Sequence, residues 1–337
     1  MSLESLPILD FSRLSAGPDE AAQFRNDLRD AMHEVGFLYL AGHGIPPELT
    51  DSMLGVSRRF FDLPEEQKLA VENIHSPQFR GYTRVGGELT DNAVDWREQI
   101  DIGVERPAVE PGAGVADYWR LEGPNLFPAE LPEMQKIAAE WTAKLSEISL
   151  TLLRALAVSL GAPEDTFDEA FAAQAFPLLK VVRYPGESDP DPVQGVGSHR
   201  DGGVLTLLLV EPEKGGLQVD YKGEWIDAPQ VPGTFVVNIG EMLELATDGY
   251  LKATLHRVIS PLRGTDRISL PFFFNPALDA TMPQLAVAPQ FSAKARGLSV
   301  DPTNSPILQT YGDNALRYRF RAHPNVVAAH HADLVKR

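Results

Sequence analysis

The segment from Leu178 to Phe274 alternates short apolar runs with turns that contain glycine and proline, and this pattern restricts the possible folds. Each run is too short for a typical helix and therefore predicts a strand. The predicted strands are 178–184, 204–210, 216–219, 224–226, 233–239, 256–260 and 268–274. Many short strands joined by turns are typical of an antiparallel sandwich or a jelly roll.

Helical periodicity prevails in much of the remaining chain. Apolar residues recur at three- and four-residue intervals from Met134 to Leu156 and predict one long helix at about 130–160. Shorter helices are predicted at 18–35, 47–61, 164–173, 240–251 and 306–321, whereas 64–130 reads as loops rich in proline, glycine and charge. The predicted fold class is mixed α+β, a double-stranded β-helix (jelly-roll) core with flanking helices.

Composition excludes several functions. Thirty basic and 47 acidic side chains give the chain a formal charge of −17, which opposes binding to nucleic-acid phosphates. The absence of cysteine excludes disulfides, thiolate metal ligands and cysteine nucleophiles. The sequence contains neither a basic leader with an apolar stretch nor a run long enough to span a membrane, so a cytoplasmic location is expected.

Three residues predict a metal site. His199 and Asp201 are separated by one residue at the start of an apolar, strand-like stretch, and residues i and i+2 of a strand project to the same face. His256 lies beside another short apolar segment and is the third candidate ligand. Two imidazoles and one carboxylate leave open positions on an octahedral ion, as in non-haem Fe(II) oxygenases. On such a strand, the intervening Arg200 would point away from the metal.

An arginine and a serine on a later strand predict a carboxylate-binding site. Arg267, Ser269 and Phe273 alternate within one predicted strand and therefore share a face. The planar guanidinium of arginine matches a carboxylate with two hydrogen bonds, and a hydroxyl two residues away can donate a third. Phe273 points inward by the same alternation and is a candidate substrate contact.

Two other classes of site share part of these motifs. His199-Arg200-Asp201 also spells a protein-kinase tripeptide, but Thr206 stands where that motif needs asparagine and the chain contains no Asp-Phe-Gly. A hydrolytic zinc site could use the same three ligands. The adjacent carboxylate-binding pair favours iron.

These motifs resemble a known family. His199-x-Asp201, His256 and Arg267-x-Ser269, in this order, resemble the Fe(II)- and 2-oxoglutarate-dependent oxygenases of the isopenicillin N synthase-like branch. Further segments in family order are Pro7–Phe11, Glu34–Tyr39, Gly42–Pro46, Phe60–Pro64, Arg80–Tyr82 and Arg183–Pro185. The resemblance spans roughly residues 5–276. It implies a single oxygenase domain over 1–337, with a helical and loop region at 1–130, the jelly-roll core at 174–276 and a helical tail at 277–337.

The resemblance also implies the chemistry. Fe(II) would be held by His199, Asp201 and His256, with 2-oxoglutarate as co-substrate and O2 as oxidant. Arg267, Ser269 and Tyr184 would hold the far carboxylate of 2-oxoglutarate. The implied reaction is hydroxylation or desaturation of a small molecule with release of succinate and CO2. No protein partner is evident from the sequence.

Departures from the family pattern leave alternatives open. Val182 stands where many plant members have asparagine, so one possible donor to the co-substrate is missing. The branch also includes a 2-oxoglutarate-independent oxidative cyclase and an ethylene-forming enzyme, and a catalytically silent binding protein could keep the fold. The C-terminal residues 330–337 do not resemble the penicillin-forming enzyme, which favours a hydroxylase or desaturase. Arg80 and Tyr82 are candidate substrate contacts near the pocket mouth.

The remaining histidines are predicted to lie outside the metal site. His43 stands in a glycine-flanked turn and is expected to be structural. His75 is expected to be exposed. His323, His330 and His331 lie near the C-terminus, where histidines are usually solvated, and none of them is predicted to bind metal.

Overall fold

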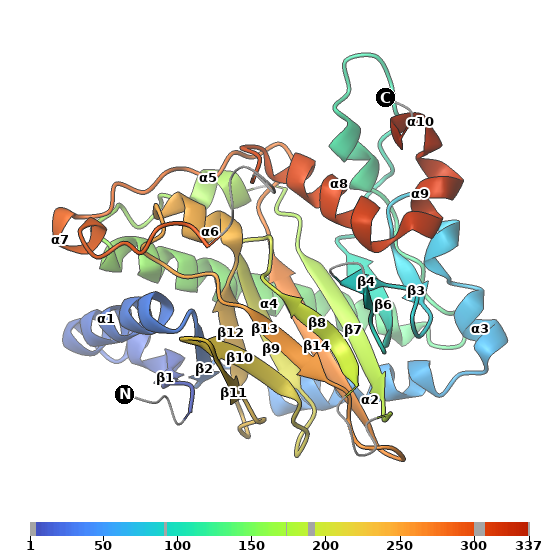
Figure 1. Cartoon of the computed structure of the whole chain (residues 1–337), viewed down its shortest axis with the longest axis horizontal. Coiled ribbons are helices and arrows are strands. Elements are labelled where there is room, and N and C mark those ends of the chain that lie inside the picture. Colours follow the sequence, from blue (N-terminus) through green and yellow to red (C-terminus); the bar gives the residue numbers. More distant parts are fainter. Residues whose placement is uncertain (1–4, 91–92, 173, 188–192, 300–306, 336–337) are drawn as a thin grey trace.

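The computed structural model describes residues 5–90, 93–172, 174–187, 193–299 and 307–335. Its centre is two β-sheets (Figure 1). In the described part of the chain, the larger sheet contains, in spatial order, β1 (Ile8–Asp10), β2 (Phe37–Ala41), β12 (Phe235–Ile239), β9 (Leu205–Val210), β14 (Asp266–Phe274), β7 (Leu178–Pro185), β6 (Glu98–Gly103) and β3 (Gly81–Thr83). All its pairings are antiparallel except that of β1 with β2.

The smaller sheet has the order β11 (Glu224–Asp227), β10 (Leu217–Tyr221), β13 (His256–Ile259) and β8 (Gln194–His199), all antiparallel. A separate hairpin joins β4 (Leu89–Thr90) to β5 (Ala93–Val94). One apolar cluster, which includes Val182, Val219 and Val258, contains residues of both sheets. Two antiparallel sheets packed over a shared core form the predicted jelly roll.

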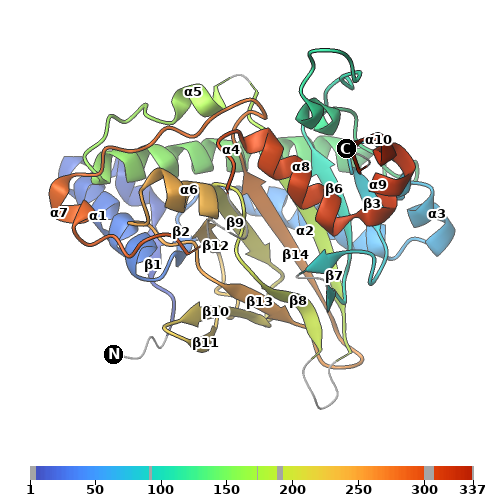
Figure 2. The same cartoon turned by 45° about the horizontal axis from the view of Figure 1, so that its top comes forward.

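Helices cover the outer face of the larger sheet (Figure 2). The long helix α4 (Glu133–Ser159) confirms the prediction at 130–160, and it packs with α1 (Pro18–Glu34) and α2 (Pro47–Phe61). Its buried residues include Trp141, Leu145 and Leu152, spaced as an amphipathic helix requires. This layer and the sheet share the largest apolar core.

Short helices complete the described chain. They are η1 (Phe11–Ser15), α3 (Glu65–Leu69), η2 (Asn73–His75), η3 (Asp117–Leu121), α5 (Asp168–Phe171), α6 (Glu241–Ala246), α7 (Pro289–Ser292), α8 (Tyr311–Ala322), α9 (Pro324–His330) and α10 (Ala332–Val335). The helix predicted at 306–321 is observed as α8, and the predicted start at residue 306 lies outside the described residues. None of the helices in the described ranges has the length and apolar character needed to cross a membrane.

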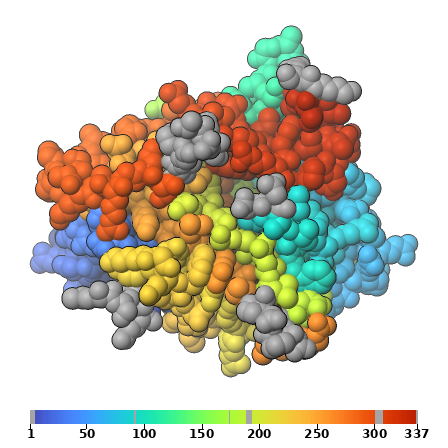
Figure 3. Space-filling view, in the orientation of Figure 1, coloured from blue at the N-terminus to red at the C-terminus, as the bar shows by residue number. Residues whose placement is uncertain are grey.

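The tail helices pack against segments that are distant in sequence. Helix α8 contacts η3 and β4, and α9 contacts η2. In the space-filling view, residues of the tail (red) accordingly lie beside those of the first third of the chain (blue to teal) on one face (Figure 3). The tail therefore closes one side of the molecule above the hairpin β4–β5.

The region 64–130 differs from the loops that its composition predicts. It contributes β3 and β6, which extend the larger sheet beyond β7. All six residues of β6 are buried, although Glu98, Gln99 and Asp101 are polar. Glu98 and Asp101 have charged partners inside the protein, and the Gln99 amide nitrogen donates to Asp101. The strand therefore lacks the apolar alternation that predicts strands from sequence.

Candidate active site

The three predicted metal ligands meet at one end of the jelly roll. His199 ends β8 and His256 begins β13, and the two residues are direct partners in the antiparallel ladder. Nε2 of His199 lies 3.7 Å from Oδ1 of Asp201, and Nε2 of His256 lies 3.6 Å from the same oxygen. In the described ranges, these residues form a group whose donor atoms all lie within 4.8 Å of one another. The spacing suits three ligands of one ion.

Asp201 reaches this position differently from the prediction. The prediction that His199 and Asp201 lie on one strand is wrong, because β8 ends at His199 and β9 begins at Leu205 in the other sheet. Asp201 stands in the crossing between the sheets. Glycines make this crossing possible: a Cβ on Gly202 would lie 2.3 Å from the Tyr318 ring, and one on Gly203 would lie 2.1 Å from Asn275 Oδ1.

Backbone carbonyls orient both imidazoles. Nδ1 of His199 lies 2.8 Å from the Gly197 carbonyl, and Nδ1 of His256 lies 3.1 Å from the Thr254 carbonyl. A carbonyl oxygen only accepts, so Nδ1 carries the proton in each contact and Nε2 keeps its lone pair. Burial, aided by the neighbouring His256, lowers the pKa of His199 to about 4, which favours the neutral imidazole that metal binding requires.

The second oxygen of Asp201 is held by two side chains. The Thr206 hydroxyl donates to Oδ2 at 2.6 Å, and the Asn238 amide donates to the same oxygen at 2.7 Å. Burial opposes ionisation of Asp201, but the facing histidines and these two hydrogen bonds outweigh it and lower the pKa of the carboxyl. Oδ1 is therefore the oxygen presented to a metal.

The predicted carboxylate-binding residues lie together on β14 and β7. Arg267 pairs directly with Tyr184 in the ladder, and Ser269 pairs with Val182. Arg267 is 1% exposed, and its guanidinium carbon lies 5.0 Å from the centroid of the Tyr184 ring. In the described part of the chain, its Nε and Nη1 have no hydrogen-bond partner.

This arrangement fits a bound anion. Burial lowers the pKa of Arg267, and a buried guanidinium without partners carries a large desolvation cost. A carboxylate that accepts hydrogen bonds from the guanidinium would reduce that cost. The residues present therefore fit 2-oxoglutarate, which has one carboxylate for the arginine and a second one, next to its keto group, for the metal.

A cavity of about 770 Å³ opens at the metal ligands. Besides His199 and Asp201, its lining residues include Glu88, Arg97, Leu178, Lys180, Arg200, Glu241, Phe273, Asn275, Tyr311, Tyr318, Arg319 and Arg321. Its volume is typical of a small-molecule site. Phe273 lines the cavity as the strand alternation predicts.

Arg80 and Tyr82 lie elsewhere. Neither is among the lining residues found in the described chain. The Tyr82 hydroxyl donates to Glu98 at 2.6 Å inside the protein. Arg80 is 1% exposed, and its guanidinium lies 5.0 Å from the ring of Phe176, which does line the cavity. Arg80 therefore contacts a residue that lines the cavity but is not itself among the lining residues of the described chain.

One wall of the cavity is a network of buried charges that sequence analysis missed. Glu88 Oε1 lies 2.7 Å from Lys180, and Glu88 Oε2 lies 2.8 Å from Arg97. Asp101 pairs with Arg319 of α8 and lies 3.7 Å from Lys180. Each of these three cations therefore already has a carboxylate partner within the protein.

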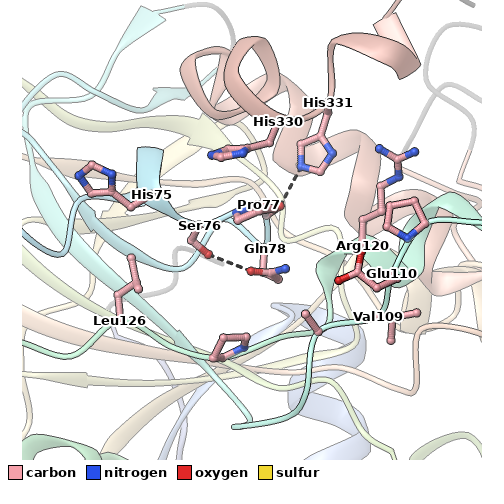
Figure 4. Close-up of a pocket in the computed structure, with 13 residues that line it drawn as sticks. His75, Ser76, Pro77, Gln78, Val109, Glu110, Arg120, Leu126, His330 and His331 are labelled. Carbon is pink, nitrogen blue, oxygen red and sulfur yellow. Dashed lines mark hydrogen bonds between the residues drawn. The ribbon is translucent and has the colours of Figure 1, made fainter.

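The tail histidines are structural, contrary to the expectation that they are solvated. His323 and His331 are 0% and 1% exposed. The His331 ring stacks on Phe79. His331 also donates to the Pro77 carbonyl at 2.7 Å (Figure 4). With His330 it lines a separate cavity of about 430 Å³. His75, which also lines that cavity, is exposed as predicted.

Comparison with known proteins identifies the family. The model for the 2OG-Fe(II) oxygenase superfamily matches residues 175–276, and the model for the N-terminal region of the non-haem dioxygenase in morphine synthesis matches residues 6–130. A 2-oxoglutarate-dependent dioxygenase of Dothideomycetidae sp. (strain 11243) is 36% identical, over 97% of this chain and 92% of that protein.

This chain is an Fe(II)- and 2-oxoglutarate-dependent oxygenase. A homoarginine-6-hydroxylase of Arabidopsis thaliana is 33% identical over 87% of the oxygenase and 91% of its own length. Among solved structures, a full-length Neurospora crassa protein in complex with alpha-KG and thymine has a TM-score of 0.71 at 28% identity, covering 85% of the oxygenase and 91% of the Neurospora chain. JOX2 in complex with 2OG, Fe and JA has a TM-score of 0.71 at 27% identity, covering 94% of the oxygenase and 85% of JOX2. The predicted family, jelly-roll fold and cofactors are thus confirmed.

Proposed function

We propose that this oxygenase hydroxylates a C–H bond of a small molecule, with Fe(II) held by His199, Asp201 and His256. The proposal rests chiefly on one observation: three donor atoms converge in a jelly roll that also buries Arg267, whose Nε and Nη1 have no hydrogen-bond partner in the described chain. Arg267, Ser269 and Tyr184 are assigned to the far carboxylate of 2-oxoglutarate. The expected co-products are succinate and CO2.

The side chains provide geometry and exclude water. When bound, Fe(II) supplies the redox chemistry that couples O2 and 2-oxoglutarate to oxidation of a C–H bond. Thr206 and Asn238 orient Asp201 so that one carboxylate oxygen faces the imidazoles. Three protein ligands on one side leave positions for the co-substrate and O2. The apolar core between the sheets keeps bulk water away from Arg267, which strengthens its interaction with an anion.

The relatives favour this reaction over the alternatives of the same branch. Two of the proteins compared above carry the names 2-oxoglutarate-dependent dioxygenase and homoarginine-6-hydroxylase. Those names support a hydroxylase over an oxidative cyclase or an ethylene-forming enzyme. A catalytically silent binding protein is disfavoured because all three ligand positions are filled and their donor atoms lie close together.

The substrate is proposed to be a small molecule that enters the 770 Å³ cavity. The solved relatives contain thymine and JA in addition to the co-substrate. Phe273 is the proposed apolar contact because it lines the cavity on the same strand as Arg267.

We also propose that residues 1–337 act as one oxygenase domain, with the regions 1–130, 174–276 and 277–337 as its parts. One apolar cluster supports this proposal because it contains Leu9, Leu207 and Val327, one from each of these parts. A core shared along the chain is what one cooperative unit requires.

Succinate formation tests the proposed function. The purified protein, supplied with Fe(II), 2-oxoglutarate and O2, is expected to release succinate, and candidate substrates are expected to increase the rate. Asp201→Ala should abolish the release, whereas Arg257→Gln should retain it because Arg257 donates to Gln218 outside the cavity. Equal succinate formation by wild type and Asp201→Ala would reject the assignment.

A further inference from the structure

Two cationic side chains at the cavity have no carboxylate partner in the described chain. Arg200 donates through Nε to the Ala253 carbonyl at 3.0 Å, and no ion pair joins it to an acidic residue of that part of the protein. Arg321 is exposed at the cavity and likewise has no ion pair there. They contrast with Arg97, Lys180 and Arg319, each of which faces a carboxylate in the wall.

Helix α8 brings the second arginine toward the first. Tyr311, Ala315, Tyr318 and Ala322 recur at helical spacing and line the cavity, so this face of α8 covers it. The Tyr318 ring lies against Gly202, because a Cβ on that glycine would be 2.3 Å from the ring. Gly202 is two residues after Arg200, and Arg321 is one helical turn after Tyr318. Both arginines therefore belong to the same end of the cavity.

Tyr311 is a neutral donor at the opposite end of α8 from Arg321, because the ten positions that separate them span about 15 Å of helix. It is 7% exposed and lines the cavity, and within the described ranges its hydroxyl makes no hydrogen bond. Two carboxylates outside the metal site line the cavity in the described chain. Glu88 is already paired with Lys180 and Arg97, and Glu241 accepts from the Tyr318 hydroxyl at 3.3 Å without forming an ion pair with Arg200. The uncommitted groups here are thus mainly hydrogen-bond donors with positive charge.

Donors of this kind select an acidic ligand. A carboxylate accepts several hydrogen bonds and pairs with guanidinium groups more strongly than a neutral amide does. The protein carries a net charge of −17, so an anion is attracted only where cations gather locally. Arg267 is buried on β14 and is already assigned to 2-oxoglutarate, so it is not available to a substrate carboxylate.

We propose that the primary substrate is a small organic acid whose carboxylate binds Arg200 and Arg321. This inference rests on the proposed function, because it places the acid beside a metal site already loaded with 2-oxoglutarate. Arg200 directly follows the ligand His199, so it binds the acid next to the metal site. Arg200 and Arg321 are specificity-determining residues for the oxygenase reaction.

A retention experiment tests this proposal. The protein is loaded anaerobically with Fe(II) and 2-oxoglutarate, and the visible absorption of that complex is recorded first. It is then incubated with an equimolar mixture of matched pairs, each an aliphatic or aromatic carboxylic acid and its primary amide. Compounds retained with the protein after rapid filtration are quantified by mass spectrometry. The variants are Arg200→Gln, Arg321→Gln, Arg200→Lys and, as matched control, Arg257→Gln.

The wild type should retain at least one acid about tenfold or more above its amide. Arg200→Gln and Arg321→Gln should each reduce that preference by about tenfold, Arg200→Lys should reduce it less, and Arg257→Gln should leave it unchanged. Absence of any acid-over-amide preference in the loaded wild type overturns the proposal, as does an undiminished preference in both glutamine variants. Absence of the visible absorption in the wild type is a separate result, which rejects the proposed function and this inference with it.

Discussion

The side-chain amide of Asn238 donates a hydrogen bond to Oδ2 of Asp201 across 2.7 Å. Asn238 lies on β12 and Asp201 in the crossing from β8 to β9, so the contact fixes the metal ligand against the larger sheet. Thr206 on β9 contributes the second bond to the same oxygen. The metal site is therefore built by both sheets, although the two imidazoles come from the smaller one.

Removal of either donor to Asp201 should weaken metal binding without removing a ligand. Thr206→Val and Asn238→Ala are each expected to raise the Fe(II) dissociation constant by about 10- to 100-fold, because the carboxylate loses its fixed orientation. Anaerobic calorimetric titration with Fe(II) measures the change. Thr234→Val, which removes a hydroxyl that donates to the Val231 carbonyl, is the control and should bind Fe(II) as the wild type does. Unchanged affinity in both test variants would disprove this role.

Arg267→Gln should selectively weaken the binding of 2-oxoglutarate. The variant loses a buried cation that can donate two hydrogen bonds, so the 2-oxoglutarate dissociation constant should rise by about 10- to 100-fold. Arg267→Lys keeps the charge but loses the planar guanidinium, so its 2-oxoglutarate dissociation constant should lie between those of the wild type and Arg267→Gln. Fe(II) affinity measured without 2-oxoglutarate should stay constant. The assignment fails if Arg267→Gln binds 2-oxoglutarate with wild-type affinity.

Gly240→Ala should damage both stability and the metal site. A Cβ there would lie 2.3 Å from the Gly203 carbonyl oxygen and 2.7 Å from that of Asp201, so the backbone that carries the ligand must shift. We expect a loss of about 1–3 kcal/mol in the free energy of unfolding and weaker Fe(II) binding. Gly55→Ala in α2 is the control, because nothing lies within 4 Å of its Cβ, and it should stabilise by about 0.4–1 kcal/mol. Urea unfolding measures both, and equal stability of the two variants would contradict the packing argument.

His323 should make stability depend on pH. Burial lowers the pKa of His323 to about 4, below its ordinary value of 6.5, so the unfolded chain binds this proton first as pH falls. The contribution of this pKa difference to the free energy of unfolding is fully present above pH 6.5. It is lost as the pH falls from 6.5 toward 4, and it amounts to about 3 kcal/mol in total. His323→Gln should flatten the stability profile in this window, whereas the exposed His75→Gln should not. Identical slopes for wild type and His323→Gln would show that His323 does not cause the loss.

Sequence analysis predicts the metal ligands and the carboxylate-binding pair from residue type and spacing, and the structure brings the three predicted ligands together. The pair Arg267 and Ser269 lies on one strand, and its alternation follows directly from strand geometry. The approach of His256 to His199 depends on the pairing of β13 with β8, which strand periodicity alone does not specify. The family resemblance supplied that information.

The rest depends on tertiary contacts. Asn238 and Thr206 read as ordinary members of apolar strands, and only the folded sheet places both beside Asp201. The sequence of β6 predicts a loop, and that of the tail predicts a solvated His331, because polar residues usually lie at the surface. Here ion pairs compensate the burial of Glu98 and Asp101, and His331 donates to a carbonyl and stacks on an aromatic ring.

The most direct test of the account is anaerobic titration of the protein with Fe(II) and 2-oxoglutarate, followed by visible absorption. The wild type should develop a charge-transfer band only when both are present, Arg257→Gln should reproduce it, and Asp201→Ala should develop none. A band of wild-type intensity in Asp201→Ala, or no band in the wild type, would contradict the claim that His199, Asp201 and His256 hold the iron.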